Sequence, residues 1–178
     1  MKHVTILSVS LACLLAVTVQ GCSSSEPQTQ KPRPSAKEAF VQDTERNLEQ
    51  LNTDCTGGSG SACHTLGRYY LDGKLNINRS VEYFTKGCDY SSGESCKALG
   101  DMYYEGKLVT EDLRKARELY EKACSFKEKN ACNSVGYQYD GGIGVRQDLQ
   151  KAKEYYGQAC DLGLQLGCDN FRKVNEYE

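Results

Sequence analysis

Four pairs of cysteines with one fixed spacing constrain this chain more than any other feature of its sequence. Each pair encloses seven residues, and the enclosed letters hardly match from pair to pair, as in CDYSSGESC and CSFKEKNAC. What repeats is therefore the gap, and it repeats four times. The pairs are Cys55–Cys63, Cys88–Cys96, Cys124–Cys132 and Cys160–Cys168.

The N-terminal segment has the composition of an export signal. Lys2 precedes an apolar run over residues 4–19, which is short for a membrane span of about 20 residues but suits a signal-peptide core. The run ends in VTVQGC, which resembles a bacterial lipobox with Cys22 as the lipid acceptor. The resemblance implies a signal peptide over 1–21 and an acyl anchor on Cys22. Because Ser23 is not aspartate, it also implies an outer-membrane lipoprotein facing the periplasm. A plain secretory signal is the alternative.

The next segment, SSSEPQTQKPRPS, contains all three prolines of the chain and no apolar residue. Such a composition favours an extended tether rather than a packed element. We therefore expect a lipidated cysteine and flexible tether over residues 22–35. The tether would hold one folded domain, residues 36–178, up to roughly 40 Å from the membrane.

The eight cysteines beyond Cys22 are an even number in a chain predicted to be exported, which favours four disulfides. The repeated spacing singles out the pairing given above. Zinc is a competing use, but it favours shorter gaps and histidine ligands, and His64 is the only histidine beyond the signal segment. A redox-active pair would more often read Cys-x-x-Cys. We therefore predict structural disulfides and no metal or other cofactor.

The cysteines also follow a longer period, since Cys88, Cys124 and Cys160 are 36 residues apart and Cys55 precedes Cys88 by 33. Periods of this size indicate stacked supersecondary units. Positions three, four and seven after the second cysteine share one helical face, and glycines follow where a helix would end in a left-handed cap. The segments concerned read CHTLGRYYLDG (63–73), CKALGDMYYEG (96–106) and CNSVGYQYDGG (132–142).

A second helical pattern leads into each first cysteine, in NINRSVEYFTKGC, DLRKARELYEKAC and DLQKAKEYYGQAC. Asn76, Asp112 and Asp148 stand where N-caps are expected. Small residues suited to a close helix crossing follow, and then an aromatic residue four positions before the cysteine. The small residues are Ser80, Ala116 and Ala152, and the aromatic ones are Phe84, Tyr120 and Tyr156.

These patterns predict an all-α chain of eight helices without a strand. LGDMYYEGKLVTEDLRKARELYEKAC resembles a Sel-one-like repeat, a relative of the tetratricopeptide repeat, and the seven-residue gap is similar to that of the cysteine-rich Hcp-type secreted proteins. The resemblance implies a right-handed α/α solenoid stapled by disulfides. We expect an N-terminal helix over 36–54, repeats at about 62–88, 95–124 and 131–160, and a capping helix over 167–177.

Charge and motifs argue against several classes of function. The net charge is −2 without a basic cluster, so nucleic acid is not an expected partner. No Gly-x-Ser-x-Gly appears, and no serine is followed three positions later by lysine, so the acylating motif of penicillin-binding enzymes is missing. Hcp-type proteins are linked with penicillin binding, and a penicillin-interacting hydrolase is kept only as an outside alternative. We predict that the chain is not an enzyme and has no catalytic residue.

Binding has better support. Between repeats, the positions one, five and eight or nine after the second cysteine vary and share another helical face. In solenoids of the resembled type, the first helix of each repeat lines a concave surface. The predicted partner-binding residues are His64, Arg68, Asp72, Lys97, Asp101, Tyr104, Glu105, Asn133, Tyr137 and Asp140.

The resemblance implies a non-enzymatic scaffold that binds a protein or peptide in its concave groove. Small Sel-like periplasmic lipoproteins resemble immunity proteins that neutralise toxic effectors such as phospholipases delivered by type VI secretion. We therefore expect an immunity lipoprotein. An envelope-assembly or host-interaction adaptor is the alternative that the sequence leaves open.

Overall fold

The computed structural model describes residues 36–73 and 75–176, with side chains from residue 45 onward. The chain divides into two units, residues 1–39 and residues 40–178. Of the first unit, only residues 36–39 are described, and they begin a helix. The predicted signal peptide, the lipid acceptor Cys22 and the tether up to residue 35 lie outside the described residues.

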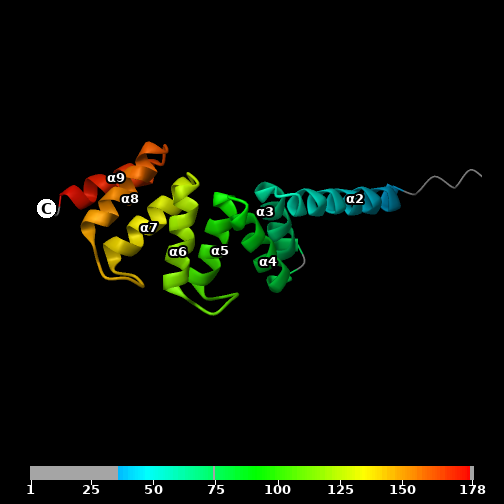
Figure 1. The fold of residues 1–178 in the computed structure, drawn as a ribbon, viewed down its shortest axis with the longest axis horizontal. Helices are drawn as coiled ribbons and strands as arrows, with labels where there is room; N and C mark the ends of the chain where they lie inside the picture. Colours follow the sequence, from blue (N-terminus) through cyan, green and yellow to red (C-terminus); the bar gives the residue numbers. More distant parts are fainter. Residues whose placement is uncertain (1–35, 74, 177–178) are drawn as a thin grey trace, which may run out of the picture. The chain divides into compact units, whose positions relative to one another are not determined.

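The described residues form eight α-helices and one short π-helix, and they contain no strand (Figure 1). This confirms the predicted all-α fold. The predicted N-terminal helix extends to Thr56, and the capping helix covers Gln165–Asn175. The elements are α2 (Ala36–Thr56), α3 (Gly60–Arg68), the π-helix η1 (Tyr69–Gly73), α4 (Ile77–Asp89), α5 (Gly93–Glu105), α6 (Leu113–Ser125), α7 (Lys129–Gly141), α8 (Leu149–Asp161) and α9 (Gln165–Asn175).

From α3 onward, each helix packs mainly against its neighbours in the chain, and most closely against the other helix of its own repeat. Helices α3 with η1 and α4, then α5 and α6, then α7 and α8, form three helix-turn-helix repeats, and α9 packs on α8. Neighbours in sequence are thus neighbours in space, as in a solenoid in which each unit contacts only the adjacent ones.

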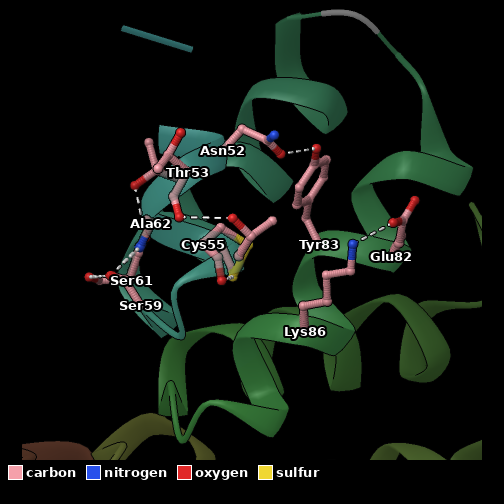
Figure 2. The surroundings of a disulfide bond; sticks show 12 residues. Asn52, Thr53, Cys55, Ser59, Ser61, Ala62, Glu82, Tyr83 and Lys86 are labelled. Atoms are coloured by element: carbon pink, nitrogen blue, oxygen red, sulfur yellow. Dashed lines mark hydrogen bonds and ion pairs between the residues drawn. A yellow bond between two sulfur atoms is a disulfide. The ribbon is translucent and has the colours of Figure 1, made fainter. Parts of the chain in front are cut away.

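All four predicted cysteine pairs form disulfide bonds, with Cα atoms 4.5–4.7 Å apart. These separations lie within the range that a disulfide can span. Each bond joins the end of one helix to the first turn of the next, as Cys55 of α2 is joined to Cys63 of α3; Figure 2 shows the surroundings of Cys55. Two bonds therefore staple one repeat to the following one, and the other two staple α2 and α9 to the first and third repeats.

The backbone explains why the spacing is constant while the enclosed letters differ. The third residue after each first cysteine has a positive φ: Gly58, Ser91, Lys127 and Gly163. In every turn its N–H donates to the carbonyl of that cysteine, at 2.8–3.2 Å, and the next N–H donates to the carbonyl before the cysteine, at 2.9–3.1 Å. This is the hydrogen-bond pattern of a Schellman-type helix end. One turn geometry therefore occurs four times, with glycine at only two of its left-handed positions.

Each repeat contains one close contact between a glycine of its first helix and an aromatic ring of its second. A Cβ atom added to Gly67, Gly100 or Gly136 would lie 2.5–2.7 Å from the ring of Phe84, Tyr120 or Tyr156, respectively. The absence of a side chain is what lets the two helices approach. Arg172 takes the equivalent place in α9, and no second helix follows α9 in the described residues. Within the described residues, Arg172 thus has no second helix of its own repeat whose close approach would require a glycine.

The predicted helix caps are confirmed with one exception. The side chains of Asn76, Asp112 and Asp148 each accept a backbone N–H three residues on, and Gly106 and Gly142 end their helices in the left-handed conformation. The prediction for Gly73 is wrong. Here the loop is three residues shorter, and the first helix continues as the π-helix η1 up to Gly73.

The buried side chains form one large core and smaller ones. The large core joins residues from α4 to α9, including Tyr120, Tyr139, Tyr156 and Val174. A separate cluster around Cys55, Cys63 and Leu66 lies where α2 meets the first repeat. Two further small clusters form around Phe84, Leu99 and Met102 and around Cys124, Cys132 and Ala159.

Candidate protein-binding face

The ten predicted binding residues lie on the first helices of the three repeats, and none of them is buried. We call this surface the first-helix face. Its predicted concavity stays a prediction. By element, the residues are His64 and Arg68 on α3 with Asp72 on η1; Lys97, Asp101, Tyr104 and Glu105 on α5; and Asn133, Tyr137 and Asp140 on α7.

Most of the charges on this face in the first two repeats are paired within their own helix. Arg68 contacts Asp72 at 2.7 Å, and Lys97 contacts Asp101 at 2.7 Å, each across one helical turn. Pairs of this kind contribute only a few tenths of a kcal/mol when exposed. Because each pair is neutral as a whole, these two repeats present little charge to a partner at these positions.

Two tyrosine hydroxyls from the second helices reach this face, which the sequence analysis did not anticipate. Tyr120 donates a hydrogen bond to Asp101 at 2.8 Å, and Tyr156 donates to Asp140 at 3.4 Å. Burial, followed by the neighbouring aspartate, raises the pKa of both tyrosines far above the usual value, so both remain protonated donors. The residue type gave one indication of these contacts, because a buried tyrosine hydroxyl usually finds a hydrogen-bond partner.

The two repeats place their aspartate and tyrosine in opposite order. Counting from the second cysteine, positions five and eight are Asp101 and Tyr104 in the second repeat, but Tyr137 and Asp140 in the third. An aspartate at position five or at position eight can accept the hydroxyl of the buried tyrosine, and a tyrosine occupies the remaining position in each repeat. Burial, followed by Tyr137 and Glu111, raises the pKa of Tyr104.

His64 is a packing residue as much as a surface one. Its ring lies 5.5 Å from that of Phe84, and its Nε2 is 3.9 Å from the carboxylate of Glu94. Burial lowers the pKa of His64, although Glu94 opposes this shift. The imidazole is therefore neutral at pH 7, and His64 adds aromatic surface rather than charge to the face.

In the third repeat, one predicted binding residue is held by a contact within the chain and another is largely exposed. Asn133 accepts a hydrogen bond from Asn170 of α9 at 2.9 Å, so its side chain is held. Tyr137, in contrast, has 52% of its surface exposed and is one of the few large exposed side chains among the described residues. Among the predicted binding residues of the third repeat, Tyr137 is therefore the most accessible one.

A second kind of surface lies where tyrosines of the first helices meet cations of the second helices. Arg79 donates to the hydroxyl of Tyr70 at 2.9 Å, and Tyr70 stacks on Tyr83 with ring centroids 5.4 Å apart. Tyr83 in turn donates to Asn52 of α2 at 3.0 Å, as Figure 2 shows. The cations and hydroxyls here are paired within the chain, so this surface is better explained by packing than by binding.

The described residues contain no group of three or more histidine, cysteine, aspartate or glutamate residues that could hold a metal ion. None of the helices they form is both long and apolar enough to cross a membrane.

Comparisons with known proteins place this geometry among solved structures. A Sel1 repeat protein from Oxalobacter formigenes is 27% identical, with a TM-score of 0.67 over 72% of this chain and 98% of that one. Helicobacter pylori cysteine rich protein B is 28% identical, with a TM-score of 0.56 over 76% of this chain and 96% of that one. No curated protein matches the sequence.

A third structure shares the fold alone. It is c5321, described as a protective antigen present in uropathogenic Escherichia coli strains displaying an SLR fold. It is 23% identical, with a TM-score of 0.66 over 75% of this chain and 29% of that one.

The profile of the Sel1 repeat matches residues 60–89, 93–125 and 129–164, which is more than half of the chain. These segments coincide with α3–α4, α5–α6 and α7–α8. Members of this family are typically non-enzymatic scaffolds for protein–protein interaction. The chain belongs to the Sel1 repeat family.

Proposed function

We propose that this chain is a protein-binding scaffold, anchored in the bacterial envelope through a lipid on Cys22 and facing the periplasm. It binds its partner through the first-helix face. Tyr137 carries the proposal, because a large aromatic side chain with 52% of its surface exposed is costly to leave in water on a rigid helix. Tyrosine adds rigid amphipathic area and is enriched at the energetic centres of protein interfaces.

We further propose that the partner is a toxic effector enzyme and that the scaffold acts as an immunity protein. The lipobox-like VTVQGC and the proline-containing tether would hold the domain near the membrane, where an effector that attacks lipids would arrive. Two features of the scaffold support this role: disulfide staples that keep the face rigid and a folded domain small enough to plug an active site. The adaptor role differs only in the identity of the partner.

The experiment is affinity capture from envelope extract with oxidised protein comprising residues 36–178. We expect capture of one protein, and loss of that capture in the double variant Tyr104→Ala, Tyr137→Ala. The matched control is Tyr90→Ala, which removes a tyrosine that is 43% exposed but lies beyond the end of α4 and is not one of the ten face residues. The melting temperature should stay nearly unchanged in Tyr90→Ala and in the single variant Tyr137→Ala, whereas loss of Tyr104 also removes packing against Tyr120 and should lower it.

Unaltered capture by the double variant would exclude the first-helix face. If the captured protein is an envelope-degrading hydrolase and is inhibited by the scaffold, the immunity role is supported. If it is an assembly factor or a host protein, the adaptor role replaces it.

A further inference from the structure

The carboxylate of Asp140 has no compensating positive charge. It accepts one hydrogen bond, from the neutral hydroxyl of Tyr156 at 3.4 Å, and no cation of the described residues forms an ion pair with it. The side chain is only partly exposed. A partly buried carboxylate without a cation retains a local negative potential that a charged partner can use.

The second repeat shows how the same arrangement looks when it is compensated. Asp101 accepts the hydroxyl of Tyr120 at 2.8 Å, and it also contacts the ammonium of Lys97 at 2.7 Å. The position of Lys97 is taken in the third repeat by Asn133, which instead bonds Asn170. The third repeat, which has the more exposed tyrosine, therefore lacks the cation that Lys97 provides in the second repeat.

An exposed tyrosine lies next to the uncompensated carboxylate on α7. Tyr137 precedes Asp140 by three residues on α7, so the two side chains are neighbours on the helix surface. A cation over a tyrosine ring is favourable, and the chain already contains such a contact, with Lys115 4.0 Å from the ring centre of Tyr103.

We infer that Asp140 and Tyr137 form a subsite for an arginine side chain of the partner protein. The guanidinium would donate to Asp140 and stack on Tyr137. Arginine fits better than lysine, because its planar group can stack on an aromatic ring and bond a carboxylate at the same time. The inference rests on the proposed function, since it assigns the chemistry of one contact within the same binding face.

The test is an NMR titration of the ¹⁵N-labelled exported protein in non-ionic detergent with N-acetylarginine amide. The neutral isostere N-acetylcitrulline amide is the matched probe. We expect saturable amide shifts that centre on Tyr137 and Asp140, decrease with added salt, and weaken at least fivefold with citrulline. Equal shifts with both probes, or shifts spread over carboxylates elsewhere in the chain, would overturn the inference.

Two variants isolate the charge. Asp140→Asn keeps an acceptor for Tyr156 and should abolish the preference for arginine. Asp101→Asn, at a carboxylate already neutralised by Lys97, should leave it intact. If partner capture is lost with Tyr137→Ala but kept with Asp140→Asn, the binding face stands and the arginine subsite is wrong. If capture is unaffected by both variants while the arginine probe still binds, the subsite stands and its role in partner binding is wrong.

Discussion

The first repeat and the two that follow it reach the same helix pairing by different routes. In the second and third repeats, a left-handed glycine ends the first helix and a loop leads to an aspartate cap. In the first, the loop is three residues shorter and a π-helix replaces the glycine cap. In all three, the N–H of the capping residue donates to the carbonyl of the equivalent tyrosine: Asn76 to Tyr70 at 2.8 Å, Asp112 to Tyr103 at 3.0 Å and Asp148 to Tyr139 at 3.0 Å. Helix pairing, rather than loop length, is thus what the repeat preserves.

The two regions also differ in how their cores connect. The large core runs from α4 to α9 and includes side chains of the second and third repeats and of the capping helix. Cys63 and Leu66 of α3, in contrast, belong to a small separate cluster with α2. Because solenoid stability is a sum of repeat and interface contributions, the N-terminal end should open at a lower free energy than the rest.

Removal of a disulfide should reveal the difference in stability between the two regions most strongly. Each bond closes a loop of nine residues, which the chain-entropy description values at about 2.5 kcal/mol. In Cys124→Ala, Cys132→Ala, we expect the main urea transition to lose about this free energy of unfolding. In Cys55→Ala, Cys63→Ala, we expect less than half of that loss in the main transition, together with faster amide exchange in α2 and α3. Equal losses in the main transition would show that the two regions unfold as one.

A methyl group on the close-contact glycines provides a sharper comparison at somewhat lower cost. Gly136→Ala would place a Cβ 2.6 Å from the ring of Tyr156, and Gly67→Ala would place one 2.5 Å from that of Phe84. Overpacking of this kind costs about 1–3 kcal/mol. We expect Gly136→Ala to lower the main unfolding transition, and Gly67→Ala to act mainly on amide exchange in α3 and α4.

The matched control is Gly157→Ala, because Gly157 also lies inside a helix but its added Cβ would meet only Phe171, at 3.5 Å. Alanine is favoured over glycine there by about 0.5–1 kcal/mol, so this variant should be more stable than the unmodified protein. Destabilisation by Gly157→Ala would mean that helix approach is not what the contact glycines provide.

The smallest effect concerns pH and should be confined to the first repeat. Burial lowers the pKa of His64 in the folded state below its unfolded value of 6.5. The unfolded state therefore binds more protons as the pH falls through this value, and stability present above pH 6.5 is lost below it. The equivalent residues of the other repeats are Lys97 and Asn133, so only the first repeat has a histidine at this position.

The measurement is the melting temperature at pH 7.5 and pH 5.5. We expect a modest decrease at the lower pH, and a smaller one in His64→Asn, which introduces the residue of the third repeat. An identical decrease in both proteins would show that His64 is not the source of the pH dependence.

Local rules made much of the fold predictable. The cysteine spacing identified all four disulfides, because a fixed chain length between two helices permits only a few turn geometries. The capping aspartates and the periodic glycines placed the helix ends. The prediction of a left-handed cap at Gly73 was wrong. A helix end depends on how much chain remains to reach the next helix, and here the remaining loop is too short for such a cap.

The candidate site was less predictable, because its chemistry depends on partners from other helices. Helical periodicity placed Asp101 and Asp140 on the exposed first-helix face. It did not indicate that Tyr120 and Tyr156 bond them, nor that Lys97 compensates one while the other has no cation. His64 likewise appeared as a surface residue, and only its contact with Phe84 shows why its pKa falls.

The amino-acid sequence by itself determined the elements of this protein, their order and the covalent links between them, since each depends on residues a few positions apart. The tertiary structure alone decided which glycines lie against aromatic rings, which left-handed turn positions dispense with glycine, and which carboxylate remains without a cation. These features depend on distances between helices that are far apart in the chain, and residue spacing alone does not specify such distances.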